Sequence, residues 1–230
     1  MNIDEKEIDN FDLFAHEWWN KRGPYKLIHN LTPIRLEYIQ SQLDIKNLEI
    51  LDIGCGGGIL SEELTKNGAQ VTGLDASKKT IKIAKNHAKE KNYNIRYLDA
   101  SIESHIKESK AKYDAIICFE LIEHVPDQIK LIQDISTICK KGGKLFMSTI
   151  NRNLMSFVFA KMMAEYVLRI VPEGTHQYNK FIKPSELANI LEQANFNVDD
   201  IQGVKVNPVD FSFSLSSITK INYFMTATKK

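Results

Sequence analysis

The sequence contains few cysteines and carries almost no net charge. Its three cysteines, Cys55, Cys118 and Cys139, are odd in number and widely spaced, which argues against a disulfide framework. We expect them to be reduced and mostly buried, as in a cytosolic protein. The formal net charge of +1 gives no overall reason to expect a nucleic-acid partner.

Long apolar runs are also missing. No stretch approaches the roughly 20 apolar residues that a membrane-spanning helix needs. The chain begins with the acidic segment MNIDEKE, which argues against a secretory signal and against an arginine-rich mitochondrial presequence. With no internal repeat and no low-complexity linker, the 230 residues are expected to form one cytoplasmic domain.

What the sequence does contain is a regular alternation of strand and helix patterns. A helix is predicted over 5–20 and another from about Thr32-Pro33, with Thr as cap and Pro at the first helical position. Strands are then predicted at 48–53, 70–75, 94–98, 113–119 and 143–150. Helices are predicted at 58–67, 77–91, 101–108 and 127–140, followed by a helix at 184–194 and strands at 196–206 and 219–228.

This alternation predicts an α/β fold with a mostly parallel sheet and helices on both faces. In such a sheet, ligands bind at the carboxyl ends of the strands, where the strand order reverses. The single domain is expected to consist of four parts: a helical cap over 1–45, a ligand-binding core over 46–150, an insertion over 151–181 and a closing helix and strands over 182–230.

A glycine-rich stretch joins the first predicted strand to the helix that follows it. It reads LEILDIGCGGGIL from Leu48 to Leu60. Glycine permits a tight turn and lets a ligand approach the backbone, and the adjacent helix N-terminus offers unpaired amides. The dinucleotide fingerprint G-x-G-x-x-G would need a glycine at position 59, where this chain has isoleucine. The pattern present is D-x-G-x-G-x-G, formed by Asp52, Gly54, Gly56 and Gly58.

Asp75 ends the second predicted strand, 21 residues after Gly54. An acidic side chain at this place can accept hydrogen bonds from both hydroxyls of a ribose. Alternatively, it caps the helix that begins near Ser77. Ribose binding would suit NAD as well as other adenosine cofactors, so Asp75 alone does not separate them.

The fourth predicted strand ends in the polar segment CFELIEHVP, from Cys118 to Pro126. If the chain turns helically after Phe119, the side chains of Glu120, Glu123 and His124 fall on one face. Two carboxylates and an imidazole on one turn can bind Mg²⁺ or Mn²⁺, or supply a general base. The alternative is that one carboxylate caps the turn while His124 packs in the core.

Residues 151–181 interrupt the alternation. The stretch from Leu154 to Val171 predicts an apolar helix with one charged stripe, formed by Lys161, Glu165 and Arg169. Because it follows the fifth strand, it would lie above the carboxyl edge of the sheet, near any substrate. It could lie on an anionic membrane surface or close as an internal lid, and both interpretations remain open. His176, in the following loop, is a candidate substrate contact or base.

Several of these segments resemble known proteins. The D-x-G-x-G-x-G pattern resembles motif I of the class I methyltransferases, which bind S-adenosyl-L-methionine. Over nearly its whole length the chain resembles the ubiquinone-biosynthesis O-methyltransferase family. The segments that carry this more specific resemblance are Trp18-Trp19, Thr32–Leu36, Glu123–Asp127, Asn151-Arg152-Asn153, Gly174-Thr175-His176 and Phe181–Pro184.

The resemblance implies a Rossmann-like, seven-stranded sheet whose last strands are antiparallel. It also implies cofactor contacts from Arg35, Asp52, Gly54, Gly56, Asp75, Asp99 and Phe119. Arg35 would meet the cofactor carboxylate and Asp99 the adenine amino group, although Asp99 could instead cap a helix. Phe119 departs from the methionine often found at its place. In eukaryotic members a Glu, Glu, His trio is associated with Mg²⁺, and it matches Glu120, Glu123 and His124 here.

By the same resemblance, the substrate is a polyprenylated phenol or quinol whose ring hydroxyl is methylated. Such a substrate suggests peripheral contact with anionic lipids of the inner membrane and with other enzymes of ubiquinone biosynthesis, and no nucleic acid. Three alternatives remain: an NAD-dependent oxidoreductase, a protein that binds S-adenosyl-L-methionine without catalysis, and a methyltransferase for another small phenol.

Overall fold

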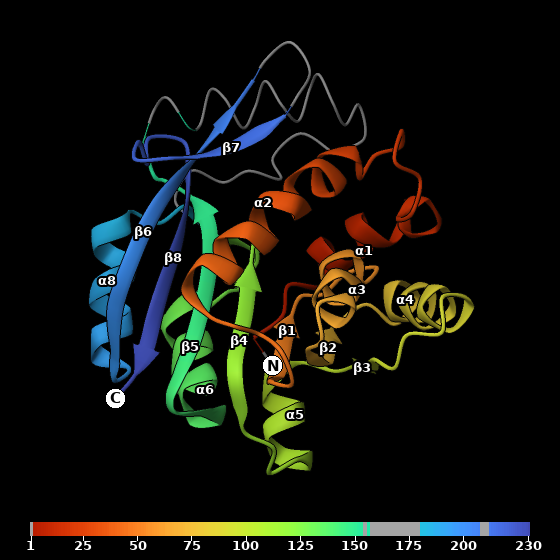
Figure 1. The fold of residues 1–230 in the computed structure, drawn as a ribbon, viewed down its shortest axis with the longest axis horizontal. Helices are drawn as coiled ribbons and strands as arrows, with labels where there is room; N and C mark the ends of the chain where they lie inside the picture. Colours follow the sequence, from red (N-terminus) through yellow and green to blue (C-terminus); the bar gives the residue numbers. More distant parts are fainter. Residues whose placement is uncertain (1, 154–155, 157–179, 208–211) are drawn as a thin grey trace.

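The computed structural model describes residues 2–153, 156, 180–207 and 212–230. Figure 1 shows a twisted central sheet with helices on both sides. The five parallel strands are β1 Glu49–Ile53, β2 Gln70–Asp75, β3 Arg96–Asp99, β4 Tyr113–Phe119 and β5 Cys139–Ile150. Three antiparallel strands complete the sheet: β6 Phe196–Val206, β7 Phe213–Ser216 and β8 Asn222–Lys229.

The strand order is β3-β2-β1-β4-β5-β8-β6-β7, which confirms the predicted α/β fold. The described sheet has eight strands instead of seven, because the short strand β7 pairs with β6 beyond the expected edge. The order reverses between β1 and β4, so the crevice at their carboxyl ends is where ligands bind in this architecture.

Alternate residues of the central strands supply two separate cores. Leu51 of β1 and Ile116 of β4 face helices α5 Ile102–Glu108, α6 Gln128–Ile138 and α8 Pro184–Gln193. Their neighbours Ile50 and Ile117 face α2 Lys26–Gln42 and α3 Ile59–Lys66. Because both faces are covered, β1 and β4 are almost continuously apolar, as expected of buried parallel strands.

Side-chain caps explain where several helices begin. Ser77 accepts a hydrogen bond from the Thr80 amide at the start of α4 Lys78–Glu90. Ser101 and Asp127 act in the same way at the starts of α5 and α6. These caps account for the close agreement between predicted and observed boundaries at this end of each helix.

The amino-terminal region differs from the prediction. The helix expected over 5–20 is shorter, with α1 at Glu5–Asp12 and a 3₁₀ turn, η1, at Ala15–Glu17. Helix α2 begins at Lys26, before Thr32-Pro33, and continues through Pro33. Residues on both sides of the proline pack into the core, and this tertiary packing outweighs the local break that proline favours.

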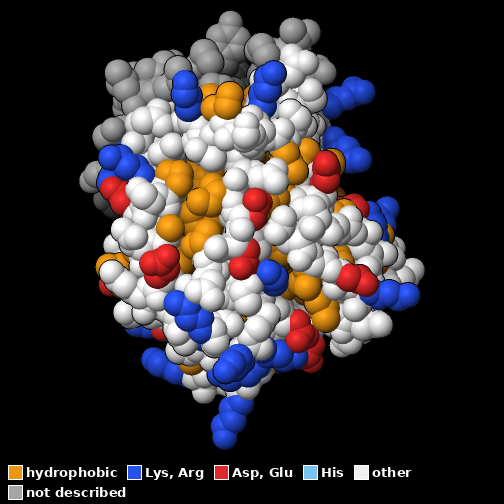
Figure 2. All heavy atoms as spheres, turned by 60° about the vertical axis from the view of Figure 1, so that its left-hand side comes forward, with side chains coloured by type: hydrophobic (Ala, Val, Ile, Leu, Met, Phe, Trp, Pro, Cys, Tyr) orange, Lys and Arg blue, Asp and Glu red, His pale blue; other side chains and the backbone are white. Residues whose placement is uncertain are grey.

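The surface carries hydrophobic patches between charged groups. Figure 2 brings the side with α8 and β6 forward and shows such patches, with Lys and Arg gathered towards its lower edge. That edge is opposite to the carboxyl ends of β4 and β5. Among the helices in the described ranges, none combines the length and apolarity that crossing a bilayer requires.

Candidate functional site

The turn between β1 and α3 uses left-handed backbone at three glycines. Gly54, Gly56 and Gly58 have φ of 73°, 54° and 86°, conformations that cost other residues strain. The amides of Gly54 and Cys55 both donate to the Leu74 carbonyl, at 2.8 and 2.9 Å. The turn is thereby tied to β2, at the crevice between β1 and β4.

Protein side chains occupy the space in which these glycines lack a Cβ. A Cβ on Gly56 would lie 2.5 Å from the Trp18 indole, and one on Gly57 would lie 2.7 Å from it. A Cβ on Gly58 would lie 2.2 Å from the Tyr97 hydroxyl. The sequence suggested that the glycines admit a ligand to the backbone. The structure shows that protein packing itself requires those at 56, 57 and 58.

Position 59, where a dinucleotide fingerprint needs glycine, is filled by a packed side chain. Ile59 is buried in a small cluster with Ala15, Trp18 and Tyr25. The first turn of α3 is therefore covered by the amino-terminal segment at the place where the fingerprint would leave the backbone bare.

Asp75 points back into the glycine turn from the end of β2. One carboxylate oxygen accepts from the Gly56 amide at 2.9 Å and the other from the Ser77 amide at 2.8 Å. Burial raises the pKa of Asp75 above its usual value. Because Ser77 caps α4, Asp75 is not needed as the side-chain cap.

Asp99 lies beside Asp75, because the two residues are in register at the ends of β3 and β2. The side-chain cap of α5 is Ser101, which accepts from the Ser104 amide at 3.2 Å. Asp99 itself is exposed. Asp75 and Asp99 thus lie at the carboxyl edge of the sheet, and neither is a helix cap. Both carboxylates are therefore available for the ribose and adenine contacts that the sequence predicts.

A buried arginine stands over the end of β4. Arg35, on α2, is 6% exposed, and its guanidinium lies 5.5 Å from the centre of the Phe119 ring. Its Nη2 atom is 3.8 Å from Glu120 Oε1. Its Nε atom is buried and has no hydrogen-bond partner within the described part of the chain. A buried, unsatisfied donor is costly, so this geometry fits an anionic or carbonyl group of a ligand.

Asp52, near the end of β1, favours the charged form of this arginine through its own charge. It is 4% exposed and accepts a hydrogen bond of 2.6 Å from the Ser61 hydroxyl. Burial raises the pKa of Asp52 to about 6, although Ser61 and the Arg35 charge favour the ionised form. Asp52 is thus a buried residue, and its contact with the cofactor stays a prediction.

The segment after β4 does not form the predicted helical turn. Glu120 has φ of 50°, and the 3₁₀ helix η2 begins only at Ile122 and ends at His124. At this position the Glu120 amide donates to the Ser148 carbonyl at 3.1 Å, and the Ser148 hydroxyl donates to Glu120 Oε1 at 2.7 Å. The expectation that three side chains share one helical face is therefore wrong.

The other two side chains of the trio have separate partners. Glu123 is 4% exposed and accepts from the Thr149 hydroxyl at 2.9 Å. His124 Nδ1 lies 3.4 Å from an oxygen of Glu7, on α1. Across the described ranges, no group of three or more His, Cys, Asp and Glu side chains is arranged to hold a metal ion. The trio as placed here does not fit a Mg²⁺ site, and no chemical step below relies on one.

Charge balance in this segment shifts two pKa values. Burial raises the pKa of Glu123 to about 7, and the neighbouring Glu120 adds to this. Burial alone would lower the pKa of His124, but Glu7, Glu123 and Glu120 outweigh it, so the pKa of His124 is raised. Glu7 was not a candidate from the sequence, because it lies 117 positions before His124 and only the fold brings them together.

Glu123→Gln should stabilise the unliganded protein at alkaline pH. The carboxyl group has a pKa of about 7 in the folded chain and 4.5 as its reference value, so the folded state binds the proton more tightly. Its contribution to stability therefore falls as pH rises from about 4.5 to 7 and stays low above that. We expect a gain of about 1–3 kcal/mol at pH 8 and little at pH 5. Thermal unfolding at both pH values measures this, with the exposed Glu90→Gln as control; equal gains at both would contradict it.

Two predicted features lie outside the described residues. His176 is one, and the apolar stretch 154–171, of which only Ser156 is described, is the other. Conversely, Trp18, Trp19 and Tyr97 hold the glycine turn without having been singled out as site residues. The tandem tryptophan was visible in the sequence, but no local pattern connects it with a turn more than 30 residues away.

Comparisons with known proteins identify the fold and the family of the chain. Residues 31–201 match the family described as "Methyltransferase domain". Among solved structures, a magnesium protoporphyrin IX methyltransferase of Synechocystis with bound SAM has a TM-score of 0.66 at 18% identity, covering 99% of this chain and 98% of that one. A SAM-dependent methyltransferase of Thermotoga maritima has a TM-score of 0.67 at 16% identity, covering 96% and 99%. At these identities the likeness concerns the fold.

Curated relatives are much more similar in sequence. A ubiquinone biosynthesis O-methyltransferase of Coxiella burnetii is 44% identical over 228 residues, which are 99% of this chain and 97% of the relative. One of Nitrosospira multiformis is 42% identical, covering 98% and 94%, and one of Vibrio campbellii is 41% identical, covering 100% and 98%. Matches of this identity over nearly the full length, on the fold and site described above, show that the chain belongs to the ubiquinone biosynthesis O-methyltransferase family.

Proposed function

We propose that this methyltransferase transfers a methyl group from S-adenosyl-L-methionine to a ring hydroxyl of a polyprenylated phenol or quinol in ubiquinone biosynthesis. The observation that carries the proposal is the carboxyl edge of the sheet beside the crevice between β1 and β4. There Asp75, at the end of β2, faces the glycine turn, and the buried Arg35 keeps an unsatisfied donor. The names and near full-length similarity of the relatives support the substrate class.

Five positions around the crevice suit the parts of this cofactor. Asp75 and Asp99 stand at adjacent strand ends, where they could meet the ribose hydroxyls and the adenine amino group. Arg35 Nε could donate to the cofactor carboxylate. Phe119, 8% exposed below Arg35, offers an apolar edge and a backbone contact in place of methionine, and Gly54 lets the chain turn beside it. When bound, the cofactor supplies an electrophilic sulfonium methyl group.

The protein's part in the reaction is then alignment and proton removal. Holding the acceptor oxygen in line with the methyl group supplies much of the rate enhancement. A phenolic hydroxyl has a pKa of roughly 10, so it needs a base near neutral pH. We assign this role to His124, whose imidazole is held by Glu7 at the end of β4. His176 is the alternative base in the same proposal.

The pH dependence of methyl transfer tests the role of His124. To act as a base, His124 must be unprotonated, whereas Glu7 stabilises its protonated form. Glu7→Gln should therefore lower the pKa of His124 and move the acidic limb of the kcat/KM profile to lower pH. Glu5→Gln, on the same helix but exposed, is the control. An unmoved acidic limb in Glu7→Gln would remove His124 as the base.

One assay tests the substrate class and the metal together. Labelled methyl transfer should be measured to a prenylated catechol and to the same catechol without the prenyl tail, before and after EDTA. We expect the prenylated acceptor to be preferred and most of the rate to survive EDTA, because the trio as placed does not form a cation site. A loss restored by Mg²⁺ would contradict this expectation and show that the reaction requires a cation. Absence of transfer to any catechol would contradict the proposed function.

The membrane contact is a separate part of the proposal. A polyprenyl chain resides in a bilayer, and residues 154–171 combine many apolar side chains with Lys161 and Arg169. Such a segment could bring the protein to anionic lipid and its substrate. Flotation of the intact protein with anionic liposomes at low salt is expected, and recovery of all the protein in the lipid-free fraction would contradict this part alone.

A further inference from the structure

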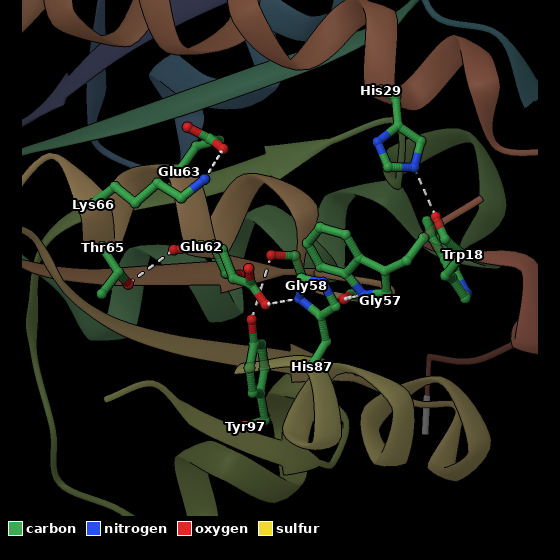
Figure 3. A network of polar contacts seen from close by, with 12 residues as sticks. Trp18, His29, Gly57, Gly58, Glu62, Glu63, Thr65, Lys66, His87 and Tyr97 are labelled. Atoms are coloured by element: carbon green, nitrogen blue, oxygen red, sulfur yellow. Dashed lines mark hydrogen bonds and ion pairs between the residues drawn. The ribbon is translucent and has the colours of Figure 1, made fainter. Parts of the chain in front are cut away.

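A buried carboxylate outside the proposed reaction lies directly behind the glycine turn. Glu62, in the first turn of α3, is 2% exposed. Its Oε1 atom lies 2.7 Å from Nδ1 of His87, on α4, and Figure 3 shows the two side chains pointing at each other. A carboxylate is costly to bury without a partner, so this pair fixes the imidazole in one orientation.

The imidazole in turn supports a tryptophan. The Trp19 indole stacks on the His87 ring with centroids 3.4 Å apart and planes 8° from parallel. Parallel stacking of this kind fixes the plane of the indole as well as its distance. The three side chains, which we call the Glu62–His87–Trp19 stack, connect α3 and α4 with the amino-terminal segment.

The far end of the stack holds the cofactor turn itself. Trp19 Nε1 donates to the Gly57 carbonyl at 3.1 Å. The Gly57 carbonyl and the Gly58 amide belong to one planar peptide unit. That amide donates to the Cys55 carbonyl at 3.0 Å. The preceding residue, Gly56, donates to Asp75, which faces the proposed ribose site. Trp19, which is outside the turn, thus helps to set the orientation of the Gly57–Gly58 peptide. This peptide lies next to Gly56, which is bonded to Asp75.

The neighbouring tryptophan provides a contrast. Trp18 also packs on the turn, against Gly56 and Gly57, and stacks on Tyr25 at 3.8 Å. Its Nε1 atom, however, has no hydrogen-bond partner among the residues that the structure describes. The two indoles therefore touch the same turn, but only Trp19 is seen to bond to its backbone.

We propose that Trp19 is a positioning residue for the cofactor site, and that the buried Glu62–His87 pair holds its indole so that the Gly57 peptide keeps its orientation. Trp19 acts through the turn and touches no reacting atom. This inference rests on the proposed function, because it assumes that the turn binds the adenosyl cofactor.

The test compares Trp19→Phe with Trp18→Phe in the full-length protein. Both substitutions remove an indole N–H and part of a ring, but only the first removes a bond to the turn. We expect Trp19→Phe to weaken the binding of S-adenosylhomocysteine about tenfold by isothermal titration and to raise the KM for S-adenosyl-L-methionine equally, with kcat within twofold. Trp18→Phe loses packing against the turn but no bond to it, so it should change both constants clearly less than Trp19→Phe does. Equal losses in the two variants, or none in Trp19→Phe, would overturn the proposal.

A second pair of variants covers the case in which Trp19→Phe fails to fold. Glu62→Gln keeps an oxygen that can accept from His87, whereas Glu62→Leu removes it. We expect near wild-type affinity for the first and about tenfold weaker binding for the second; equal affinities would overturn the proposal. If wild-type protein itself does not bind S-adenosylhomocysteine, the proposed function fails. If it binds and the variants do not differ, only the positioning role fails.

Discussion

Gly58→Ala is expected to destabilise the protein by about 3 kcal/mol. Two effects add: a left-handed residue with a Cβ costs about 1–2 kcal/mol, and overpacking costs about 1–3 kcal/mol. The second applies because the Cβ would lie 2.2 Å from the Tyr97 hydroxyl and 2.8 Å from the ring carbon that bears it. Denaturant unfolding followed by circular dichroism measures the loss, and binding of S-adenosylhomocysteine should be lost with it.

Gly142→Ala is the matched control that measures the cost of the left-handed backbone conformation alone. Gly142 has φ of 74°, close to the 86° of Gly58, but nothing lies within 4 Å of its missing Cβ. We expect it to cost about 1 kcal/mol. Adding Tyr97→Phe to Gly58→Ala should recover part of the loss, since it removes the nearest atom. If the two glycine variants are equally stable, packing against Tyr97 is not what requires glycine at position 58.

Asp75→Asn is expected to weaken binding of S-adenosylhomocysteine about 100-fold. The proposed ribose contacts are two hydrogen bonds to a charged acceptor, each worth about 1.5–3 kcal/mol, against about 0.5–1.5 kcal/mol for a neutral acceptor, so the change loses roughly 1–1.5 kcal/mol per bond. The asparagine amide can still accept from one of the Gly56 and Ser77 amides, but its NH₂ group faces the other donor. Isothermal titration gives the affinity, and thermal unfolding without ligand shows whether the variant is folded.

Asp99→Asn, one strand away, separates a ribose contact from a general charge effect. Asp99 is exposed and in register with Asp75, so both variants remove one negative charge from the same edge. A single adenine contact should cost less than tenfold. Equal losses for the two variants would contradict the assignment of the ribose to Asp75. If the wild-type protein binds NAD and not S-adenosylhomocysteine, the assignment of S-adenosyl-L-methionine as the cofactor is wrong.

Patterns within a few residues were sufficient to predict most elements of the core. Strands β2, β4 and β6 begin and end where predicted, because apolar runs flanked by polar or turn-forming residues are local signals. The isoleucine at position 59 was enough to disfavour a dinucleotide site, since that motif depends on backbone spacing alone. Sequence resemblance then identified the family, which neither composition nor charge could do.

Local signals failed where distant residues decide the conformation. The proline at position 33 suggested a helix start, yet the packing of α2 against the sheet carries the helix through it. Glu120 was expected in a helical turn, but it has a positive φ and exchanges hydrogen bonds with Ser148, on β5. In both places the energy of tertiary contacts exceeds the local preference.

By itself, the sequence determined the α/β order, the position of the glycine turn and the acidic residues at the strand ends, since each depends on neighbours along the chain. Only the tertiary structure decided which side chains surround that turn. Trp18 and Tyr97 fill the space beside its glycines, Trp19 bonds to it, and Glu7 meets His124. Side-chain packing and ion pairing depend on distance in space, and the fold sets those distances between residues far apart in the chain.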